Sequence, residues 1–150
     1  MKKILVISFA FLFFVITKSH AQDQSTQHQL ISSEWRQVAN SDGMKVFVNT
    51  KSIKRIKNEV TIWTLNSFSE YQQLVGSGNK FRSMKVKQLF NCDSETSYIY
   101  TISWYEGQHG DGKVVLSDSY PNPQSNLSHI VPGSVGEATY SFACSYKRKK

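Results

Sequence analysis

The amino-acid sequence predicts one domain built on a mostly antiparallel β-sheet. Short runs rich in β-branched and aromatic residues begin near Glu34 and alternate apolar with polar side chains. Turn-forming residues separate these runs at distances typical of hairpins. The length of 150 residues suits a single domain, and no sequence repeat indicates a second one.

The runs that we expect to form strands follow one another along the chain. They cover residues 35–39, 44–49, 60–65, 83–92, 97–105 and 113–117. Turn signals lie between them, at residues 40–43, 57–59, 76–79 and 110–112. Two prolines make the later segment 120–126 irregular. Because the connections are short, successive strands are expected to pair antiparallel.

The alternation of side chains assigns two of these strands to faces of the sheet. In the strand 83–92, the residues of one parity are Met84, Val86, Phe90 and Cys92, while Lys85 and Lys87 take the other. In the strand 97–105, the residues of one parity are Tyr98, Tyr100, Ile102 and Trp104. Along a hairpin the aromatic set is expected to share the face of Cys92. We therefore interpret it as core packing rather than as a ligand platform.

The C-terminal segment fits two patterns. Ser134 followed by Glu137 matches a capping box, which opens a helix. The residues that instead alternate with small side chains, as in a strand, are Tyr140, Phe142, Cys144 and Tyr146. The local pattern leaves helix and strand both open for residues 137–146.

Residues 1–21 are expected to be a cleavable signal peptide. Two lysines precede the apolar run Ile4–Ile16, and Ser19-His20-Ala21 supplies small residues at the positions that signal peptidase reads. The run is shorter than the roughly 20 apolar residues of a membrane-spanning helix, and no cysteine follows it as in a lipoprotein. The mature chain from Gln22 is expected to be exported, to the periplasm or outside the cell, without a lipid anchor or a membrane span.

The charges of the mature chain are balanced except at its end. The whole chain has 18 basic and 11 acidic residues, a formal net charge of +7. Three of the basic residues lie within 1–21, so the mature chain carries +4, and the basic tail 147–150 accounts for all of it. Residues 22–33 form a polar lead that is expected to be flexible. This balance does not favour a nucleic-acid partner.

Cys92 and Cys144 are the only cysteines of the chain. In an oxidising compartment, an even number of cysteines indicates a disulfide. A zinc site is disfavoured because there is no CxxC motif and no neighbouring pair of histidines. We therefore expect a bridge between these two residues.

An ordered set of landmarks runs through the mature chain. They are Trp35, Val46-Phe47-Val48-Asn49, Ser52-Ile53, Val60-Thr61-Ile62-Trp63, Ser83-Met84-Lys85, Asn91-Cys92, Val131-Pro132-Gly133-Ser134, Gly136-Glu137 and Cys144. Their order resembles the surface-adhesin protein E-like domain family of small exported Gram-negative proteins, over residues 34–146. The resemblance implies an α+β fold of about six antiparallel strands. It also implies a C-terminal helix that the Cys92–Cys144 disulfide tethers to the concave face of the sheet.

The same resemblance implies a function in binding. The namesake of the family is an adhesin for host extracellular-matrix and serum proteins, so we expect an exported adhesion module with an acidic or extracellular-matrix protein as ligand. The alternative is a periplasmic structural or envelope-associated protein without a host ligand. The mature chain contains no HExxH, GxSxG, P-loop or CxxC motif, and its histidines are scattered. We therefore expect no catalytic residues, no metal and no cofactor.

One concentration of charge is the candidate binding site. It consists of Lys80, Arg82, Lys85 and Lys87. A second basic group precedes it in the chain, at Lys51, Lys54, Arg55 and Lys57. The alternative interpretation is a solvated strand face whose lysines discourage pairing with a neighbouring sheet edge.

Overall fold

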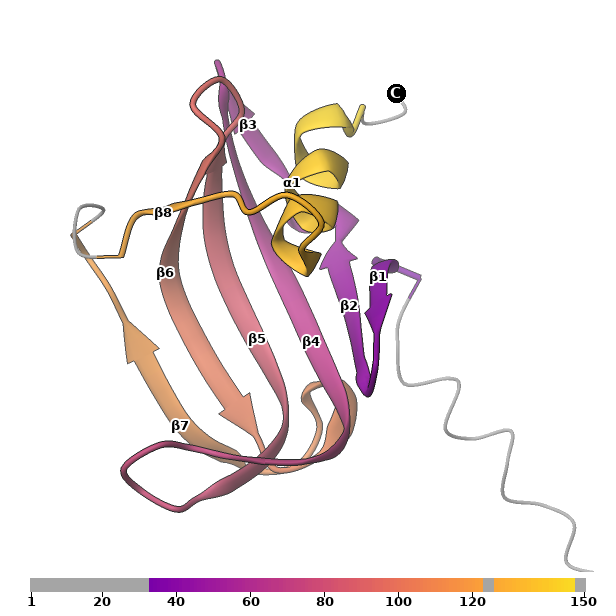
Figure 1. The fold of residues 1–150 in the computed structure, drawn as a ribbon, viewed down its shortest axis with the longest axis vertical. Coiled ribbons are helices and arrows are strands. Elements are labelled where there is room, and N and C mark those ends of the chain that lie inside the picture. Colours follow the sequence, from indigo (N-terminus) through magenta and orange to yellow (C-terminus); the bar gives the residue numbers. More distant parts are fainter. Residues whose placement is uncertain (1–32, 123–125, 148–150) are drawn as a thin grey trace, which may run out of the picture.

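The computed structural model describes residues 33–122 and 126–147. The expected signal peptide 1–21, nearly all of the lead 22–33 and the last three residues of the basic tail lie outside this part. One curved antiparallel sheet forms the body of the domain, and an α-helix crosses one of its faces (Figure 1). The predicted α+β class is confirmed. All helices in the described part fall short of the length and apolar character needed to cross a membrane.

The main path of the sheet runs in the order β1-β2-β4-β5-β6-β7. These strands are β1 (Trp35–Ser41), β2 (Met44–Asn49), β4 (Glu59–Gln73), β5 (Lys80–Asn91), β6 (Thr96–Tyr105) and β7 (Val114–Ser119). Each pairs antiparallel with its neighbours. All expected strands are present, and β4 extends well beyond the predicted residues 60–65.

Two short strands complete the sheet. β3 (Lys54–Ile56) folds back on the start of β4 through a tight turn, in which Lys57 has a positive φ of 53°. β8 (Ser128–His129) pairs with the start of β6. Neither was predicted, because runs of two or three residues carry no alternation pattern. The second half of β4 was missed because most of its residues are polar.

The C-terminal segment is the helix α1 (Val135–Ser145), with Ser134 as its N-cap. The Ser134 hydroxyl oxygen accepts a hydrogen bond from the backbone N–H of Glu137 at 3.1 Å. The Glu137 carboxylate in turn accepts one from the backbone N–H of Gly133 at 2.7 Å. The first bond satisfies a donor at the start of the helix, and the second ties Glu137 to the residue before the N-cap, as in a capping box shifted by one residue. The capping pattern therefore prevails over the strand-like alternation.

The helix packs against the sheet around Ala143. This residue is fully buried in a cluster whose other members are Val48, Val60, Ile62 and Phe90. A disulfide joins Cys92, just after β5, to Cys144 in the last turn of α1, with an S–S distance of 2.05 Å, which confirms the predicted bridge. We call this side of the sheet the helix face and the opposite side the outer face.

A bulge in β6 reverses part of the predicted aromatic stripe. Lys87 pairs with Thr101 but Gln88 pairs with Ile99, so Tyr100 is an extra residue in β6. Tyr100 lies on the outer face, whereas Ile102 lies on the helix face. The prediction that Tyr98, Tyr100, Ile102 and Trp104 share the face of Cys92 is wrong, because the extra residue shifts the alternation by one.

The connection between β6 and β7 covers one half of the outer face. It contains the short 3₁₀ helix η3 (Gln108–Gly110). The Gln108 side-chain amide donates to the carbonyl oxygen of Phe68 at 2.7 Å, and the Ser83 hydroxyl donates to the carbonyl oxygen of Gly107 at 2.6 Å. The ring of His109 meets Phe47 edge-on, with 5.9 Å between centroids. This connection does not reach the half of the outer face near β3.

Candidate functional site: a groove on the outer face

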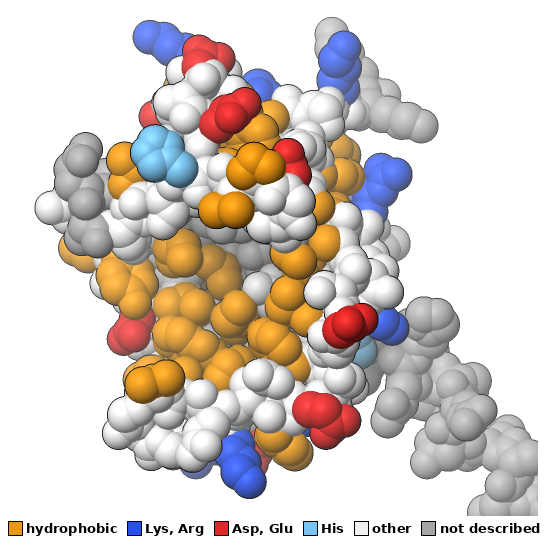
Figure 2. Space-filling view, in the orientation of Figure 1, with side chains coloured by type: hydrophobic (Ala, Val, Ile, Leu, Met, Phe, Trp, Pro, Cys, Tyr) orange, Lys and Arg blue, Asp and Glu red, His pale blue; other side chains and the backbone are white. Residues whose placement is uncertain are grey.

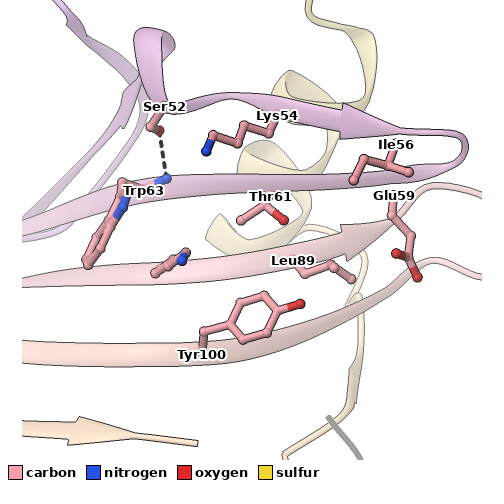
Figure 3. A pocket seen from close by; sticks show the side chains of 9 residues that line it. Ser52, Lys54, Ile56, Glu59, Thr61, Trp63, Leu89 and Tyr100 are labelled. Carbon is pink, nitrogen blue, oxygen red and sulfur yellow. Dashed lines mark hydrogen bonds between the residues drawn. The ribbon is translucent and has the colours of Figure 1, made fainter. Parts of the chain in front are cut away.

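A groove of about 490 Å³ lies on the outer face beside β3. Figure 3 looks into it, with α1 behind the sheet. Its side chains come from β3 to β6 and from the 3₁₀ turn η2 (Thr50–Ser52). They are Ser52, Lys54, Ile56, Glu59, Thr61, Trp63, Lys87, Leu89 and Tyr100.

Local hydrogen bonds hold one wall of the groove in place. The Asn49 side-chain oxygen caps η2 by accepting from the backbone N–H groups of Lys51 at 3.0 Å and Ser52 at 3.1 Å. The Ser52 hydroxyl oxygen then accepts from the backbone N–H of Trp63 at 2.9 Å (Figure 3). The turn is thereby fixed against β4, and β3 follows it directly.

The floor of the groove is set by strand register. Trp63 on β4 is directly opposite Lys87 on β5, and Thr61 is opposite Leu89. Such directly opposed side chains lie close together on one face of an antiparallel pair. The groove therefore combines an aromatic ring, apolar side chains and an ammonium group on two central strands.

The third strand of the floor is β6, which contributes Tyr100. The bulge turns the Tyr100 side chain to the outer face. The Lys87 Nζ atom lies 5.6 Å from the centroid of the Tyr100 ring, within the range of a cation–π contact. Tyr100 is supported by Tyr98, whose ring meets it edge-on with 4.6 Å between centroids. The Tyr98 hydroxyl donates to the carbonyl oxygen of Tyr120, and burial raises the pKa of Tyr98 above its usual value.

The groove is electrostatically uneven along its length. Lys54 extends into it near Ser52, whereas Glu59 lies toward the opposite end (Figure 3). Within residues 33–122 and 126–147, neither Lys54 nor Lys87 forms an ion pair; the salt bridge of this part joins Lys51 to Glu34. One end of the groove thus presents two ammonium groups beside Trp63. Such an end is suited to a carboxylate next to an apolar or aromatic side chain.

The structure distributes the four predicted basic residues over different places. Lys87 lines the groove. Lys85 lies farther along the outer face, where its Nζ donates to the carbonyl oxygen of Gly110 at 3.4 Å and lies 4.8 Å from the centroid of the Tyr105 ring. It is directed toward the η3 connection rather than into the groove.

The other two residues lie at the opposite end of β5. Arg82 has the opposite strand parity to Lys85, donates to the carbonyl oxygen of Ser69, and has its guanidinium carbon 5.2 Å from the centroid of the Tyr71 ring. Lys80 is exposed at the start of the strand. The fold therefore does not gather the four residues into one patch.

Lys54 and Trp63 complete the groove but were not predicted as site residues. Lys54 belongs to the second basic group noted in the sequence, and only the return of β3 onto β4 brings it near Lys87. In the sequence, Trp63 alternates with the buried Val60 and Ile62. This alternation is the one sequence signal that could have placed Trp63 on the outer face. In the described part of the chain, no three His, Cys, Asp or Glu side chains come together as a metal site.

Comparisons with known proteins agree with this fold. Three solved structures of Haemophilus influenzae protein E are similar over 77% of this chain. The match to one structure covers 86% of the protein E chain, with 12% identity and a TM-score of 0.55. The match to crystal form II covers 90% of that chain, with 12% identity and a TM-score of 0.57. The match to protein E from a non-typeable strain covers 78% of that chain, with 14% identity and a TM-score of 0.52.

At these identities the solved structures establish similarity of fold. A search of curated proteins finds no match to the chain. The model of the family described as surface-adhesin protein E matches residues 35–145, which is most of the chain and nearly all of the described domain. The chain belongs to the surface-adhesin protein E family.

Proposed function

We propose that this protein is an exported, non-enzymatic adhesion module that holds an acidic segment of an extracellular-matrix or serum protein in its outer-face groove. The observation that carries the proposal is the pair Lys54 and Lys87, which lack carboxylate partners and stand beside Trp63 and Tyr100. Membership of an adhesin family supports the general role. The ligand class follows from the charge and the shape of the groove.

The groove favours a carboxylate for two reasons. A hydrogen bond to a charged group contributes about 1.5–3 kcal/mol, whereas one between neutral groups contributes about 0.5–1.5 kcal/mol. Lys87 is half-buried beside the Tyr100 ring, so its ammonium group has already lost part of its water, which strengthens its attraction for an anion. Because Lys87 and Trp63 stand on central strands, their backbone is already ordered before a ligand binds, so only side-chain freedom is lost.

The remaining basic residues act in a different way. Lys80, Arg82 and the tail are separated from the groove along the chain or the sheet, so their proposed contribution is long-range attraction. Such charges increase the rate of association and are screened by salt, with a Debye length of about 8 Å at physiological ionic strength. The groove supplies the short-range contacts, and a complete interface of about 800 Å² per partner extends beyond it.

A binding measurement with two variants tests the proposal. Vitronectin and heparin are immobilised, and binding of the mature protein is compared with that of a Lys54→Gln/Lys87→Gln variant. A Lys45→Gln/Lys113→Gln variant has the same net charge but leaves the groove intact. We expect the groove variant to bind vitronectin at least about tenfold more weakly, which corresponds to 1.4 kcal/mol. Equal weakening in both variants, or no binding by the unmodified protein, would contradict the proposal.

Export to the cell surface has its own test. Intact cells are treated with an external protease, and the fate of the protein is compared with that of a periplasmic marker. Degradation of the protein with an intact marker is the expected result. Protection of both would favour the envelope-associated alternative, in which the groove serves no host ligand.

A further inference from the structure

A second recess lies on the helix face, on the opposite side of the sheet from the groove. Figure 2 shows a hollow whose visible floor is formed largely by apolar side chains. Its volume is about 470 Å³, within the range of small-molecule sites. The apolar residues that line it are Met44, Val46, Met84, Val86, Phe90, Ile99, Ile102, Ile130, Val131 and Val135.

The hollow is bounded on more than one side. Strands β2, β4, β5 and β6 form its floor, and the segment 128–131 together with the first turn of α1 forms its rim. We call this recess the strap pocket, and residues 128–131 the strap. The strap is anchored by the pairing of β8 with β6 and by a 2.9 Å hydrogen bond from the backbone N–H of Ile130 to the carbonyl oxygen of Glu95. The site is thus largely formed before any ligand arrives.

The chemistry of the lining favours an uncharged ligand. None of the residues around the strap pocket is Lys, Arg, Asp or Glu, and the imidazole among them, His129, belongs to the exposed strand β8. Two side-chain amides interrupt the apolar floor, at Asn66 and Gln88. The Gln88 amide nitrogen donates to the Thr64 hydroxyl at 3.4 Å, whereas the Asn66 side chain has no hydrogen bond within the described residues. Uncharged donors and acceptors therefore face a mostly apolar space.

The occupant lies against the apolar floor, beside the strap. An α-helix with its side chains is about 10–12 Å across. A single alkyl chain is narrower, and the flexible side chains of Met44 and Met84 adapt to its shape.

We propose that the strap pocket binds an uncharged single-chain amphiphile of the monoacylglycerol type. The alkyl chain lies against the methionines and branched aliphatic residues of the floor. The ester and hydroxyl groups form hydrogen bonds with the amides of Asn66 and Gln88. The proposal is independent of the outer-face groove, which lies on the opposite side of the sheet.

The two methionines allow a direct test. Met44 and Met84 are the only methionines of the predicted mature chain, and both line the pocket. The mature protein is labelled with ¹³C-methyl methionine and titrated with 1-monodecanoylglycerol below its micelle concentration. We expect saturable shifts of both methyl signals. Each additional buried methylene is worth about 0.8 kcal/mol, or about fourfold in affinity, so the octanoyl analogue should bind about fifteenfold more weakly.

A matched pair of variants locates the site. Val131 lines the pocket and is 63% exposed, so Val131→Lys places a charge on the strap without opening the core. Val75 is fully exposed and lines none of the pockets described here, so Val75→Lys is the control. We expect Val131→Lys to weaken binding at least tenfold and Val75→Lys to leave it unchanged. Asn66→Ala should weaken binding of the glyceride, and the Met84 methyl signal of the free protein should also move, because Asn66 is directly opposite Met84.

Three results would overturn the proposal. The first is the absence of saturable shifts with the decanoyl ligand. The second is an equal effect of Val75→Lys and Val131→Lys. The third is a shift of both methyl signals with protein concentration alone, together with dimers in sedimentation, which would assign the pocket to a second copy of the chain.

Discussion

The guanidinium of Arg55 donates a 2.7 Å hydrogen bond to the carbonyl oxygen of Cys144. The same nitrogen donates to the carbonyl oxygen of Ala143 at 3.0 Å. The last carbonyl groups of a helix lack partners within the helix, and a positive charge there is favourable. Arg55 therefore caps α1 from β3, next to the disulfide. The neighbouring Lys54 lines the outer-face groove, so β3 serves both faces of the sheet.

Removing the cap should weaken the attachment of the helix. We expect Arg55→Ala to lower the free energy of unfolding by about 1–2 kcal/mol, because charged hydrogen bonds to two carbonyl groups are lost. Amide hydrogen exchange should accelerate in the last turn of α1. Lys54→Ala is the matched control, since this side chain has no hydrogen bond in the described part. Equal loss of stability in both variants, measured by urea denaturation, would contradict the capping role.

The disulfide should contribute more than the arginine. Cys92 and Cys144 are separated by 52 positions, and closing a loop of this size stabilises by about 4 kcal/mol in the chain-entropy model. We expect the Cys92→Ser/Cys144→Ser variant to lose about 2–5 kcal/mol in guanidinium denaturation. The reduced unmodified protein should behave like this variant. A loss below about 1 kcal/mol would show that packing around Ala143 holds the helix without the bridge.

Tyr140 makes stability depend on pH in the alkaline range. Its hydroxyl donates to the carbonyl oxygen of Cys92 at 2.8 Å. Burial, and then the negative charges of Glu95 and Asp93, raise the pKa of Tyr140 above 10.0. The folded state thus holds this proton more tightly than the unfolded state, so the stabilisation is complete below pH 10 and is lost as the pH rises through the folded pKa.

The variant Tyr140→Phe checks this linkage. At pH 7 it should lose about 1 kcal/mol with the hydrogen bond. Between pH 10 and 11 its stability should fall less steeply than that of the unmodified protein. Part of the fall remains, because the pKa of Tyr98 is also raised. The free energy of unfolding of both proteins is measured by urea denaturation at pH 7, 9, 10 and 11. If it falls equally with pH in both, the assignment to Tyr140 is contradicted.

Cleavage of the signal peptide remains a prediction from sequence. Because small residues at Ser19 and Ala21 follow an apolar run, the exported protein should begin at Gln22. Mass spectrometry of the intact protein from the exported fraction measures this directly. A mass that includes residues 1–21 would instead indicate an anchored protein.

Alternation and turn chemistry predicted much of the sheet. The first residue of β2 and the length of β6 follow from the side-chain pattern. The alternation in β5 also correctly assigned Met84 and Val86 to the helix face. The capping pair Ser134 and Glu137 carried the signal for the helix, although a local strand pattern competed with it.

The groove could not be predicted in the same way. It depends on the bulge that turns Tyr100 to the outer face, and an extra residue leaves no mark in the alternation of a single strand. It also depends on β3, whose three residues are too few for a periodic pattern. Both features arise from pairing between strands, which sequence spacing alone does not specify.

The most direct test of the account is a salt series of binding to vitronectin. The unmodified mature protein is compared with Lys54→Gln/Lys87→Gln and with a chain that lacks residues 147–150, whose removal lowers the mature charge from +4 to 0. Short-range contacts with Lys87, which is half-buried, are screened less by salt than long-range attraction is. We predict that the tail deletion weakens binding at low salt only, and that the groove variant binds at least about tenfold more weakly at both low and physiological salt. If the tail deletion abolishes binding at all salt concentrations while the groove variant binds normally, the groove is not the binding site.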